Sequence, residues 1–522
     1  MVNVLIKKVE KEHQDYLRDE SRKVGNAESI SFPKNEFEII DILESLKINK
    51  TLVTLQGART GIAAGAVPNG GHILNLSRMN KVLGLRYDDR LDTFFLRVQP
   101  GALLSEIKEM LKKREFDTEN WSKESLDALE RLKSSQTYFF SPDPTETTAS
   151  IGGMAACNAS GACSFKYGPT RNHIQEIRVI LIDGSTVTLK RERDISNKGI
   201  FSIKTDSGKT INGTIPKYHM PQVKNASGYY VKQDMDLLDL FIGSDGTLGI
   251  ISEMELKLLK EPKSIYGITA FFNNEEDSLE FIEKFRENSL PAAVEFFNHN
   301  ALDLLRKERQ VNPAFSKLLE LPLHFHTAVY IEYHGDSQEE IINMVMNTGD
   351  AIESCGGSEK DTWVATNPQA MDQLKFFRHA VPEAVNLLID ERRKADTRLT
   401  KLGTDMAVPN LKLKEIMNLY NSTLKDYNLE SVIFGHIGNN HLHVNIIPRN
   451  IDDYTKGKEL YNNWAEEVIN VGGTVSAEHG IGKLKTLLLG KMMGEQGIKE
   501  MKALKKLFDP ENRLNRGNLF EE

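Results

Sequence analysis

Three histidines within eight residues form the most reactive segment of the chain, near its C-terminal end. His436 stands in a turn before a predicted strand. Along that strand His441, His443 and Asn445 share one face, because side chains alternate with a period of two. Imidazoles that converge with an oxygen ligand suit a divalent cation such as zinc, manganese or iron. A single histidine is more often a hydrogen-bonded structural residue, but three of the chain's 13 in so short a stretch favour a metal site.

A second reactive segment, Ser476 to Lys483, follows a predicted helix and a pair of glycines. Glu478 could supply a carboxylate ligand to the same cation. His479 can accept a proton near neutral pH, as the oxidation of an alcohol requires. Read alone, the segment is equally compatible with an ordinary loop before a helix that carries a surface histidine.

Two cations are candidates for binding an anionic substrate. Arg378 follows two aromatic residues and could hold a carboxylate through two parallel hydrogen bonds. An arginine that extends into solvent is an equal alternative. Lys401 is a weaker candidate for a second contact to the same anion.

The first half of the chain contains a long run of small residues from Thr147 to Gly168. Such residues let backbone N–H groups approach a flat or anionic ligand, and they have too little bulk to form a core. A tight turn packed between sheets would explain one pair of glycines. Here the glycines recur beside polar residues that can bond to a ligand, so we interpret the run as the bed of a large cofactor.

A shorter loop, Gly57–Gly61, follows a buried strand predicted over 51–55. A strand that enters a loop of this kind often offers N–H groups to phosphate, and Arg59 adds a charge that could face a pyrophosphate. A plain turn is the alternative. Because no GxGxxG motif follows a first strand, we exclude a doubly wound nicotinamide-binding domain.

The elements that carry these residues differ between the two halves of the chain. Residues 113–137 are charged and amphipathic, which indicates a surface insertion in the first half. In the second half, strands over 265–272 and 326–333 alternate with helices near 277–287 and 337–353. This alternation predicts an α+β domain on an antiparallel or mixed sheet.

Length and composition narrow the class of protein. The 522 residues correspond to about three domain-sized units. A net charge of -8 argues against nucleic acid as a partner. Three cysteines without CxxC spacing indicate a reducing compartment and no iron–sulfur cluster or structural zinc. No apolar run reaches a membrane span of about 20 residues, so we expect a cytoplasmic protein without a transmembrane segment. Peripheral association with the inner membrane face is compatible with the sequence.

Taken together, these motifs resemble the FAD-linked oxidases of the vanillyl-alcohol oxidase superfamily, which share a PCMH-type FAD-binding domain. The branch most similar to the chain is that of the glycolate oxidase, D-lactate dehydrogenase and D-2-hydroxyglutarate dehydrogenase flavoproteins. The resemblance covers about residues 30–520, and the order and spacing of its parts make it specific. Besides the two histidine segments, its parts are Gly57–Gly61, Leu76–Asn80, Thr148–Gly161, Tyr167-Gly168, Lys224–Tyr229, Gly243–Ile250 and Phe508–Asn512.

The resemblance implies an α+β fold in which a PCMH-type FAD-binding domain of two α+β subdomains is followed by a C-terminal α+β cap (substrate) domain. We expect an N-terminal helical segment over 1–30, the FAD-binding domain over 31–262 and the cap over 263–430. A last segment, 431–522, would carry the active-site histidines and return to the FAD domain. FAD would be noncovalent, because no attachment residue is evident. The residues expected to bind it are Gly57, Ala58, Arg59, Thr60, Gly61, Ser77, Pro142, Thr148, Ile151, Gly152, Gly153, Asn158, Gly161, Tyr167, Gly168, Thr247, Gly249 and Ile250.

The activity implied by the resemblance is oxidation of a D-2-hydroxy acid of the D-lactate, glycolate or D-2-hydroxyglutarate class to the 2-oxo acid. Hydride would pass to flavin N5, and an electron acceptor protein or a quinone would then receive the electrons. The implied roles are substrate carboxylate binding for Arg378, metal ligation for His436, His443 and Glu478, substrate contact for Asn445 and acid/base chemistry for His479. The alternative is a non-redox flavin-dependent transferase of the alkylglycerone-phosphate synthase type. A homodimer is compatible with the sequence.

The sequence departs from the family pattern at three places. After the first histidine, Gly438–His441 replaces Gly-Asp-Gly-Asn, so one acidic charge is missing and one imidazole is added. This change leaves the metal and the substrate open. Arg59 occupies a position where glycine is usual, and Pro382 replaces a threonine expected four residues after Arg378.

Overall fold

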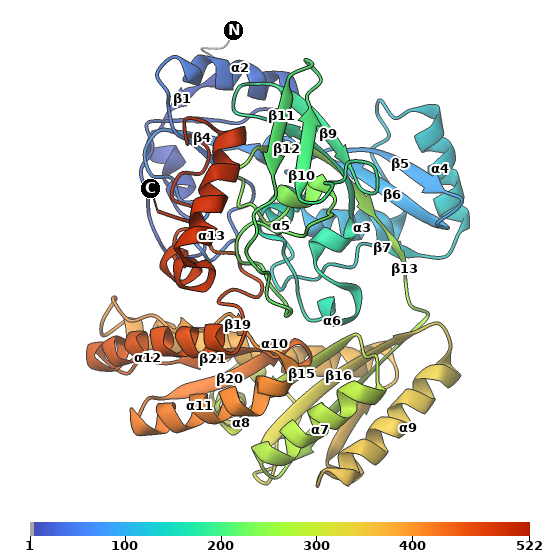
Figure 1. Ribbon diagram of the computed structural model, residues 1–522. Helices are drawn as coiled ribbons and strands as arrows, with labels where there is room; N and C mark the ends of the chain where they lie inside the picture. The colour runs from blue at the N-terminus through green and yellow to red at the C-terminus, as the bar shows by residue number, and fades with distance from the viewer. Residues whose placement is uncertain (1–4, 522) are drawn as a thin grey trace.

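The computed structural model describes residues 5–521, which form two domains joined by an extended segment near residue 262 (Figure 1). The first domain contains residues 5 to about 260, and the C-terminal helix also packs against it. The second domain contains the strands and helices from about residue 264 to residue 470. Both domains mix helices and sheets, as the α+β prediction requires.

The first domain opens with a small sheet in the order β1-β2-β4-β3, in which β2, β4 and β3 are parallel. Helix α2 covers this sheet with Ile39, Ile42 and Leu43, and Asn35 caps its first turn. Strand β3 ends at Gln56 and leads directly into the glycine loop. The elements are β1 (Lys7–Lys8), β2 (Ser29–Ser31), α2 (Glu36–Lys47), β3 (Val53–Gln56) and β4 (His72–Asn75).

The N-terminal segment is less helical than expected. Between its two short strands it contains one 3-10 helix, η1 (Lys11–Leu17). Pairing of β2 with β4 buries Ile30 completely, and this tertiary contact outweighs the local helical tendency. The first four residues of the segment lie outside the described residues.

The larger sheet of the first domain is antiparallel and has five strands in the order β5-β6-β12-β8-β9. The segment expected as a surface insertion contains α4, whose Leu129 and Leu132 are buried where the helix lies against β5. The principal strands are β5 (Val82–Asp88), β6 (Thr93–Val98), β8 (Ile174–Ile180), β9 (Thr186–Lys190) and β12 (Ile250–Lys257). The short strands are β7 (Tyr138–Phe139), β10 (Ile200–Lys204), β11 (Thr210–Thr214) and β13 (Leu259–Lys260). The helices are α3 (Leu104–Lys113), α4 (Lys123–Ser134), α5 (Ile151–Cys157) and α6 (Ser164–Tyr167).

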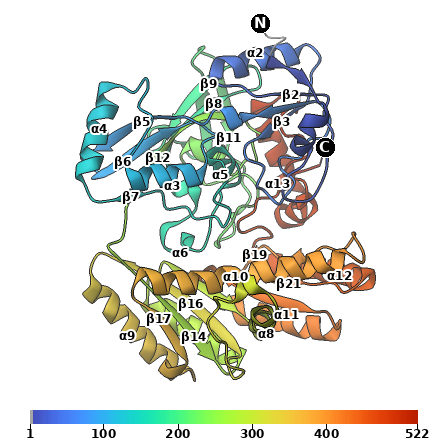
Figure 2. The ribbon, with the colours of Figure 1, turned by 180° about the vertical axis from the view of Figure 1, so that it is seen from behind.

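The second domain is built on an antiparallel sheet in the order β17-β14-β16-β15-β20-β21-β18, with β19 also paired to β21. Figure 1 shows α7 and α11 in front of this sheet, and Figure 2 shows α10 on the opposite side. Its strands are β14 (Ser264–Phe272), β15 (Ala293–Phe297), β16 (Thr327–Gly335), β17 (Thr362–Ala365), β18 (Leu402–Gly403), β19 (Met406–Ala407), β20 (Ser431–His436) and β21 (His441–Ile446). Its helices are α7 (Glu275–Asn288), α8 (His299–Val311), α9 (Gln338–Ser354), α10 (Pro368–Arg393), α11 (Leu413–Asp426) and α12 (Ile451–Asn470).

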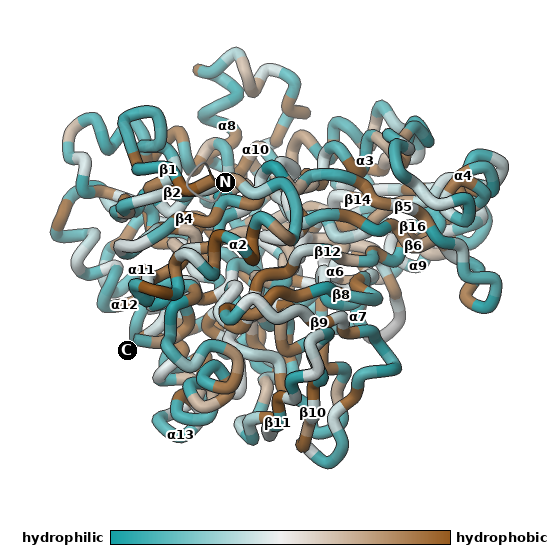
Figure 3. The backbone as a smooth tube through the Cα atoms, turned by 90° about the horizontal axis from the view of Figure 1, so that it is seen from above, coloured by the Kyte–Doolittle hydropathy of each residue, from teal (hydrophilic) through white to brown (hydrophobic). Residues whose placement is uncertain are grey.

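Separate hydrophobic clusters cover the two faces of the second sheet. One contains Phe281 of α7 and Ile341 of α9, and the other contains Leu302 of α8 and Phe377 of α10. Seen from above, hydrophobic stretches run through the strands at the centre of the molecule, and the peripheral loops are mostly hydrophilic (Figure 3). The strands that position the histidines are therefore held between two layers of helices.

The C-terminal segment returns to the first domain after helix α13 (Thr486–Phe508). Its backbone runs parallel to β3, since Val53 N donates to Arg513 O at 2.9 Å and Asn515 N donates to Val53 O at 2.9 Å. The buried carboxylate of Asp509 accepts hydrogen bonds from the backbone N–H groups of Arg513 and Leu514. These contacts hold the end of the chain next to the strand that precedes the glycine loop.

Candidate active site

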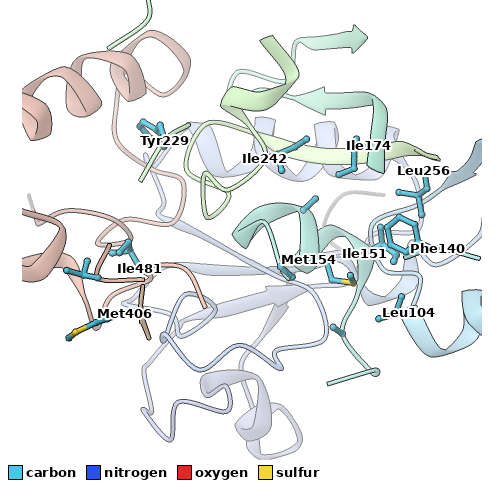
Figure 4. Close-up of a cluster of buried hydrophobic side chains, with 14 of the residues drawn as sticks. Leu104, Phe140, Ile151, Met154, Ile174, Tyr229, Ile242, Leu256, Met406 and Ile481 are labelled. Atoms are coloured by element: carbon cyan, nitrogen blue, oxygen red, sulfur yellow. The ribbon is translucent and has the colours of Figure 1, made fainter. Parts of the chain in front are cut away.

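The run of small residues forms the short helix α5 and the turns around it. Ile151 and Met154 anchor this helix, because both are buried beside Phe140 and Leu104 (Figure 4). Gly152 and Gly153 of the same helix line the cavity described below.

The glycine loop and the start of α5 are tied together by one hydroxyl group. Ser150 Oγ accepts hydrogen bonds from Ala58 N at 3.2 Å and from Gly153 N at 3.3 Å. A Cβ atom at position 57 would lie 2.1 Å from this oxygen, so a side chain there would disturb the contact between the loop and Ser150. The loop and the helix therefore form one rigid wall.

This wall encloses a cavity of about 420 Å³ that runs toward Glu478 and His479. Further parts of its lining come from Ser244–Gly246 and from two C-terminal asparagines, Asn515 and Asn518. The residues expected to bind the cofactor that do line it are Gly57, Ala58, Arg59, Thr60, Gly61, Gly152, Gly153 and Gly249. Asn515 and Asn518 were not among the expected cofactor residues, and only the expected return of the last segment to the FAD domain pointed to this part of the chain.

The other expected cofactor residues lie around this cavity rather than in its lining. Thr247 and Ile250 are fully buried, and Asn158 ends α5 and accepts a hydrogen bond from Arg171 N. Tyr167 instead bonds to His334 Nδ1 at 2.8 Å. The complete set outside the lining is Ser77, Pro142, Thr148, Ile151, Asn158, Gly161, Tyr167, Gly168, Thr247 and Ile250.

Arg59 adopts a backbone conformation that favours glycine. Its φ is 62°, and its guanidinium carbon lies 4.3 Å from the centre of the Tyr16 ring. Gln56 Nε2 donates to Tyr16 O at 2.7 Å, so the N-terminal segment supports the loop from behind. The structure thus gives residues 11–17 a task that the sequence did not reveal.

The histidine segment forms a hairpin of β20 and β21, in which His436 and His441 are directly paired. His441 and His443 lie on the same face of β21, as the alternation predicts. Ligand atoms of all three histidines and of Glu478 lie within 4.8 Å of one another. Four such groups in a buried position can hold a divalent cation.

Two of these imidazoles are held in an orientation that suits metal ligation. In each, the ring nitrogen that faces away from the cluster contacts a protein oxygen. His436 Nδ1 lies 2.7 Å from Glu295 Oε1, and His443 Nδ1 lies 3.0 Å from the carbonyl oxygen of Thr404. A metal-bound histidine is usually fixed in this way by a carboxylate or a carbonyl. His436 Nε2 then faces Glu478, 3.3 Å from its Oε2. The donor set therefore fits a metal ion.

Asp405 organises the loop that carries Glu478 and His479. Its carboxylate accepts hydrogen bonds from the backbone N–H groups of both residues at 3.1 Å and lies 3.0 Å from His441 Nε2. Lys485 Nζ donates to it at 2.6 Å. Burial alone would raise the pKa of Asp405, but His479 and Lys485 hold it well below its ordinary value. The sequence argument missed this residue, since no motif marks it.

A chain of alternating charges runs through the site. Arg378 Nε lies 3.8 Å from Glu295 Oε2, Glu295 bonds to His436, and Glu478 lies between His436 and the ammonium of Lys224. Burial would lower the pKa of His436, but Glu295 and Glu478 raise it to about 9. Burial would likewise raise the pKa of Glu478, but His436 and Lys224 hold it well below its ordinary value. His436 is thus held between two carboxylates, those of Glu295 and Glu478.

The other site residues expected from the sequence differ in whether they contact the cluster of three histidines and Glu478. His479 lines the cofactor cavity, and its Nδ1 lies 3.3 Å from Asp405 Oδ2. Asn445 Nδ2 donates to the carbonyl of His443 at 3.0 Å. Lys401 Nζ donates to Asn386 at 2.8 Å, so the structure does not bring its ammonium to the cluster. Arg378 joins it through Glu295.

Two family models match most of the chain. The model "FAD linked oxidases, C-terminal domain" matches residues 261–519, and the model "FAD binding domain" matches residues 27–122 and 124–190. Among curated proteins, the chain is 28% identical over 516 residues to a "D-lactate dehydrogenase" of Anaerostipes hadrus, covering 97% of this chain and 93% of that protein. It is 26% identical over 498 residues to the "Glycolate oxidase subunit GlcD" of Bacillus subtilis, covering 94% and 89%.

Two solved structures share the fold. A p-cresol methylhydroxylase superimposes with a TM-score of 0.67 at 13% identity, over 99% of this chain and 94% of that one. An alkyldihydroxyacetonephosphate synthase superimposes with a TM-score of 0.64 at 13% identity, over 99% and 83%. The chain therefore shares its two-domain fold with these two proteins.

The matched models are more specific than the fold. The chain belongs to the FAD-linked oxidases of the vanillyl-alcohol oxidase superfamily. Its PCMH-type FAD-binding fold confirms the fold class expected from the sequence. Within residues 5–521, no helix combines the length and the apolar character needed to cross a membrane.

Proposed function

We propose that this enzyme oxidises a D-2-hydroxy acid of the D-lactate, glycolate or D-2-hydroxyglutarate class to the corresponding 2-oxo acid. The observation that carries the proposal is the position of Glu478 and His479, which line the cofactor cavity at the point where the histidine cluster begins. A substrate bound between the cofactor cavity and the histidine cluster would contact His479 as the proton acceptor and would face the cofactor. The names of the two curated relatives support the same class of substrate.

Arg378 is the residue that we assign to the substrate carboxylate. It lies on α10 with only 14% of its side chain exposed, and burial would lower its pKa, but Glu295 and Asp143 raise it above its ordinary value. Glu295 meets it at 3.8 Å through one oxygen, so the guanidinium keeps donors for a second anion. A planar carboxylate can accept two parallel hydrogen bonds from the N–H groups of such a guanidinium.

His479 is the residue that we assign to the hydroxyl proton. Asp405 holds its Nδ1 at 3.3 Å, which fixes the ring and leaves Nε2 to accept a proton. A third of its side chain is exposed, whereas His441 is fully buried against Asp405. His479 is therefore the better placed of the two to meet a substrate.

FAD, held by the glycine loop and α5, would supply the hydride acceptor. His436, His443 and Glu478 would hold a divalent cation, which would supply Lewis-acid chemistry that lowers the pKa of a bound hydroxyl group. Lys224 and Glu295 hold Glu478 and His436 in place for this role. We assign reoxidation to a separate electron acceptor protein or a quinone, and we keep the cytoplasm as the expected location.

Anaerobic spectroscopy of the flavin tests the proposal. D-lactate, glycolate and D-2-hydroxyglutarate are each added to the FAD-loaded protein without oxygen, with the L-isomers of lactate and 2-hydroxyglutarate as controls. We expect one of these three acids to bleach the oxidised flavin and to release one 2-oxo acid per flavin. A flavin that stays oxidised with every acid in this series would overturn the proposal and favour the non-redox transferase. In His479→Asn the bleaching should slow by roughly 100-fold or more, whereas in His299→Asn, a helix α8 histidine outside the site, it should be unchanged.

A further inference from the structure

A second cavity, of about 1100 Å³, lies between the two domains. The first domain contributes α6 and the segment 220–232 to its wall. The second domain contributes Arg286 of α7 and the segment 408–412. Figure 1 shows α6 on the side of the first domain that faces the second. The proposed mechanism gives this cavity no role.

The charged residues that line this cavity are all basic. Among its described lining residues there is no aspartate or glutamate, although the whole chain has a net charge of -8. A concave surface of one charge sign concentrates ions of the opposite sign. The cationic lining residues are Arg171, Lys224, Lys232, Arg286 and Lys412.

Two of the five cations are without a carboxylate within ion-pair distance among residues 5–521. Lys232 is exposed at the surface, and Arg286 is largely buried at the end of α7. Burial lowers the pKa of Arg286 to about 10, so it stays charged at neutral pH. The other three meet Asp239, Glu478 and Glu415. The free charge of the wall therefore comes from both domains.

Three buried polar atoms of the wall also have no hydrogen-bond partner. They are Arg286 Nε, Asn225 Nδ2 and Asn439 Oδ1. Buried polar groups are satisfied in most folded proteins, so such atoms indicate a place for a ligand or for water. Two of the three are donors, and donors are what a carboxylate requires.

The inner end of this cavity adjoins the candidate active site. Ser160 lines both cavities, and its hydroxyl donates to Glu478 Oε1 at 3.2 Å. The ammonium of Lys224 meets the same carboxylate oxygen. Ser160 and Lys224 thus line the basic cavity and contact the carboxylate at the centre of the site.

We propose that the basic cavity is a vestibule that binds small carboxylates from solvent and delivers them to the site beside Glu478. The proposal rests on the function proposed above, since it takes the hydroxy acid as the anion. The carboxylate first meets Lys232 and Lys412 at the mouth and then Arg286 and Lys224 further in. The 2-oxo acid leaves along the same cations.

Charge reversal at the mouth tests the vestibule. In the FAD-loaded Lys232→Glu/Lys412→Glu protein, anaerobic flavin reduction is followed at substrate concentrations below and above saturation. We expect kcat/KM to fall about tenfold at low ionic strength, with the limiting rate of reduction unchanged. The wild-type kcat/KM should decrease as salt is added, and the variant should lose this dependence.

The matched control is Lys317→Glu/Lys394→Glu, which changes the net charge equally at exposed positions outside both cavities. It should behave as the wild type. A mouth variant with unchanged kcat/KM and unchanged salt dependence would overturn the proposal, and so would a control variant with an equal loss.

Oxalate provides a readout that needs no turnover. Calorimetric titration of the FAD-loaded proteins with oxalate should give a dissociation constant about tenfold higher in the mouth variant than in the control. Equal dissociation constants would overturn the vestibule. If no hydroxy acid bleaches the wild-type flavin, the proposed function fails, and this titration still decides whether the cavity binds carboxylates.

Discussion

Glu295 Oε1 lies 2.7 Å from His436 Nδ1, and this contact joins strands β15 and β20 at the centre of the second domain. The two residues are 141 positions apart in the chain. Both side chains are buried, with 5% and 10% of their surface exposed. The contact fixes the outer nitrogen of His436, so that its Nε2 faces Glu478. Glu295 therefore acts as a positioning residue for the candidate metal site.

The variant Glu295→Gln should bind a divalent cation 10- to 100-fold more weakly, because loss of such an outer partner reduces the basicity and the orientation of the ligand. Competition between the FAD-loaded protein and a chromophoric chelator for zinc or manganese measures the affinity. The flavin spectrum should be unchanged, since Glu295 does not line the cofactor cavity.

Glu332→Gln is the matched control for this experiment. Glu332 lies on the neighbouring strand β16, is equally buried, and bonds to His334 at 2.7 Å instead of His436. Its substitution should leave the cation affinity of the histidine cluster unchanged. Equal losses in both variants would show that the effect comes from disturbance of the sheet rather than from the contact with His436.

Arg378→Lys tests the assignment of the substrate carboxylate. Lysine keeps the charge beside Glu295 but loses the second parallel hydrogen bond, so kcat/KM for the hydroxy acid should fall by roughly 10- to 100-fold. Stopped-flow reduction of the flavin measures it. Arg392→Lys on the same helix serves as the control, because Arg392 bonds to Ile447 and Glu430 instead. A normal kcat/KM in Arg378→Lys would exclude a two-bond contact with the substrate.

Local patterns predict the parts of the site that lie close together in the chain. Alternation along β21 places His441 and His443 on one face, and the strand before Gly57 leads into the glycine loop as expected. Local patterns do not predict the residues that hold the site in place from distant parts of the chain. Glu295 stands within a strand of apolar residues, and Asp405 is reached across more than seventy positions. Their contacts depend on the order of strands in the sheet, which local spacing does not contain.

The family motifs contain residues that line the cofactor cavity and residues that support it from behind. The sequence does not distinguish the two. Ile151 and Thr247 belong to motif stretches, yet both side chains are fully buried and support the cofactor cavity from behind. Gly57 and Gly153 in the same stretches line it. Arg59 illustrates the converse case, because its partner Tyr16 comes from a segment with no motif. Only packing decides which role each residue has.

Gly57→Ala should weaken FAD binding strongly. The added methyl group would lie 2.1 Å from Ser150 Oγ, so the loop and the Ser150 hydroxyl cannot both keep their positions at the start of α5. We expect at least a tenfold rise in the FAD dissociation constant, measured by quenching of flavin fluorescence on titration of the apoprotein, since a displaced loop cannot keep its N–H groups on the pyrophosphate.

Gly61→Ala provides the comparison within the same loop. A Cβ atom at this position meets no protein atom within 4 Å, so the loop should keep its conformation and FAD affinity should fall less than in Gly57→Ala. If both substitutions weakened binding equally, flexibility of the loop rather than close packing on Ser150 would explain the glycines.

His72 should make the protein sensitive to acid. It is completely buried in the first sheet between Ser29 Oγ, at 2.9 Å from Nδ1, and Ser31 Oγ, at 2.7 Å from Nε2. Burial lowers the pKa of His72 from 6.5 to about 4. Between these values the unfolded chain binds a proton that the folded chain does not, so stability is complete above pH 6.5 and falls as the pH decreases toward 4. This difference in protonation contributes about 3 kcal/mol to the free energy of unfolding.

Urea unfolding at several pH values measures this contribution. On acidification, His72→Gln should lose less stability than the wild type by this amount. His219→Gln, at an exposed histidine, should follow the wild-type curve. Parallel curves for wild type and His72→Gln would mean that another group causes the acid sensitivity.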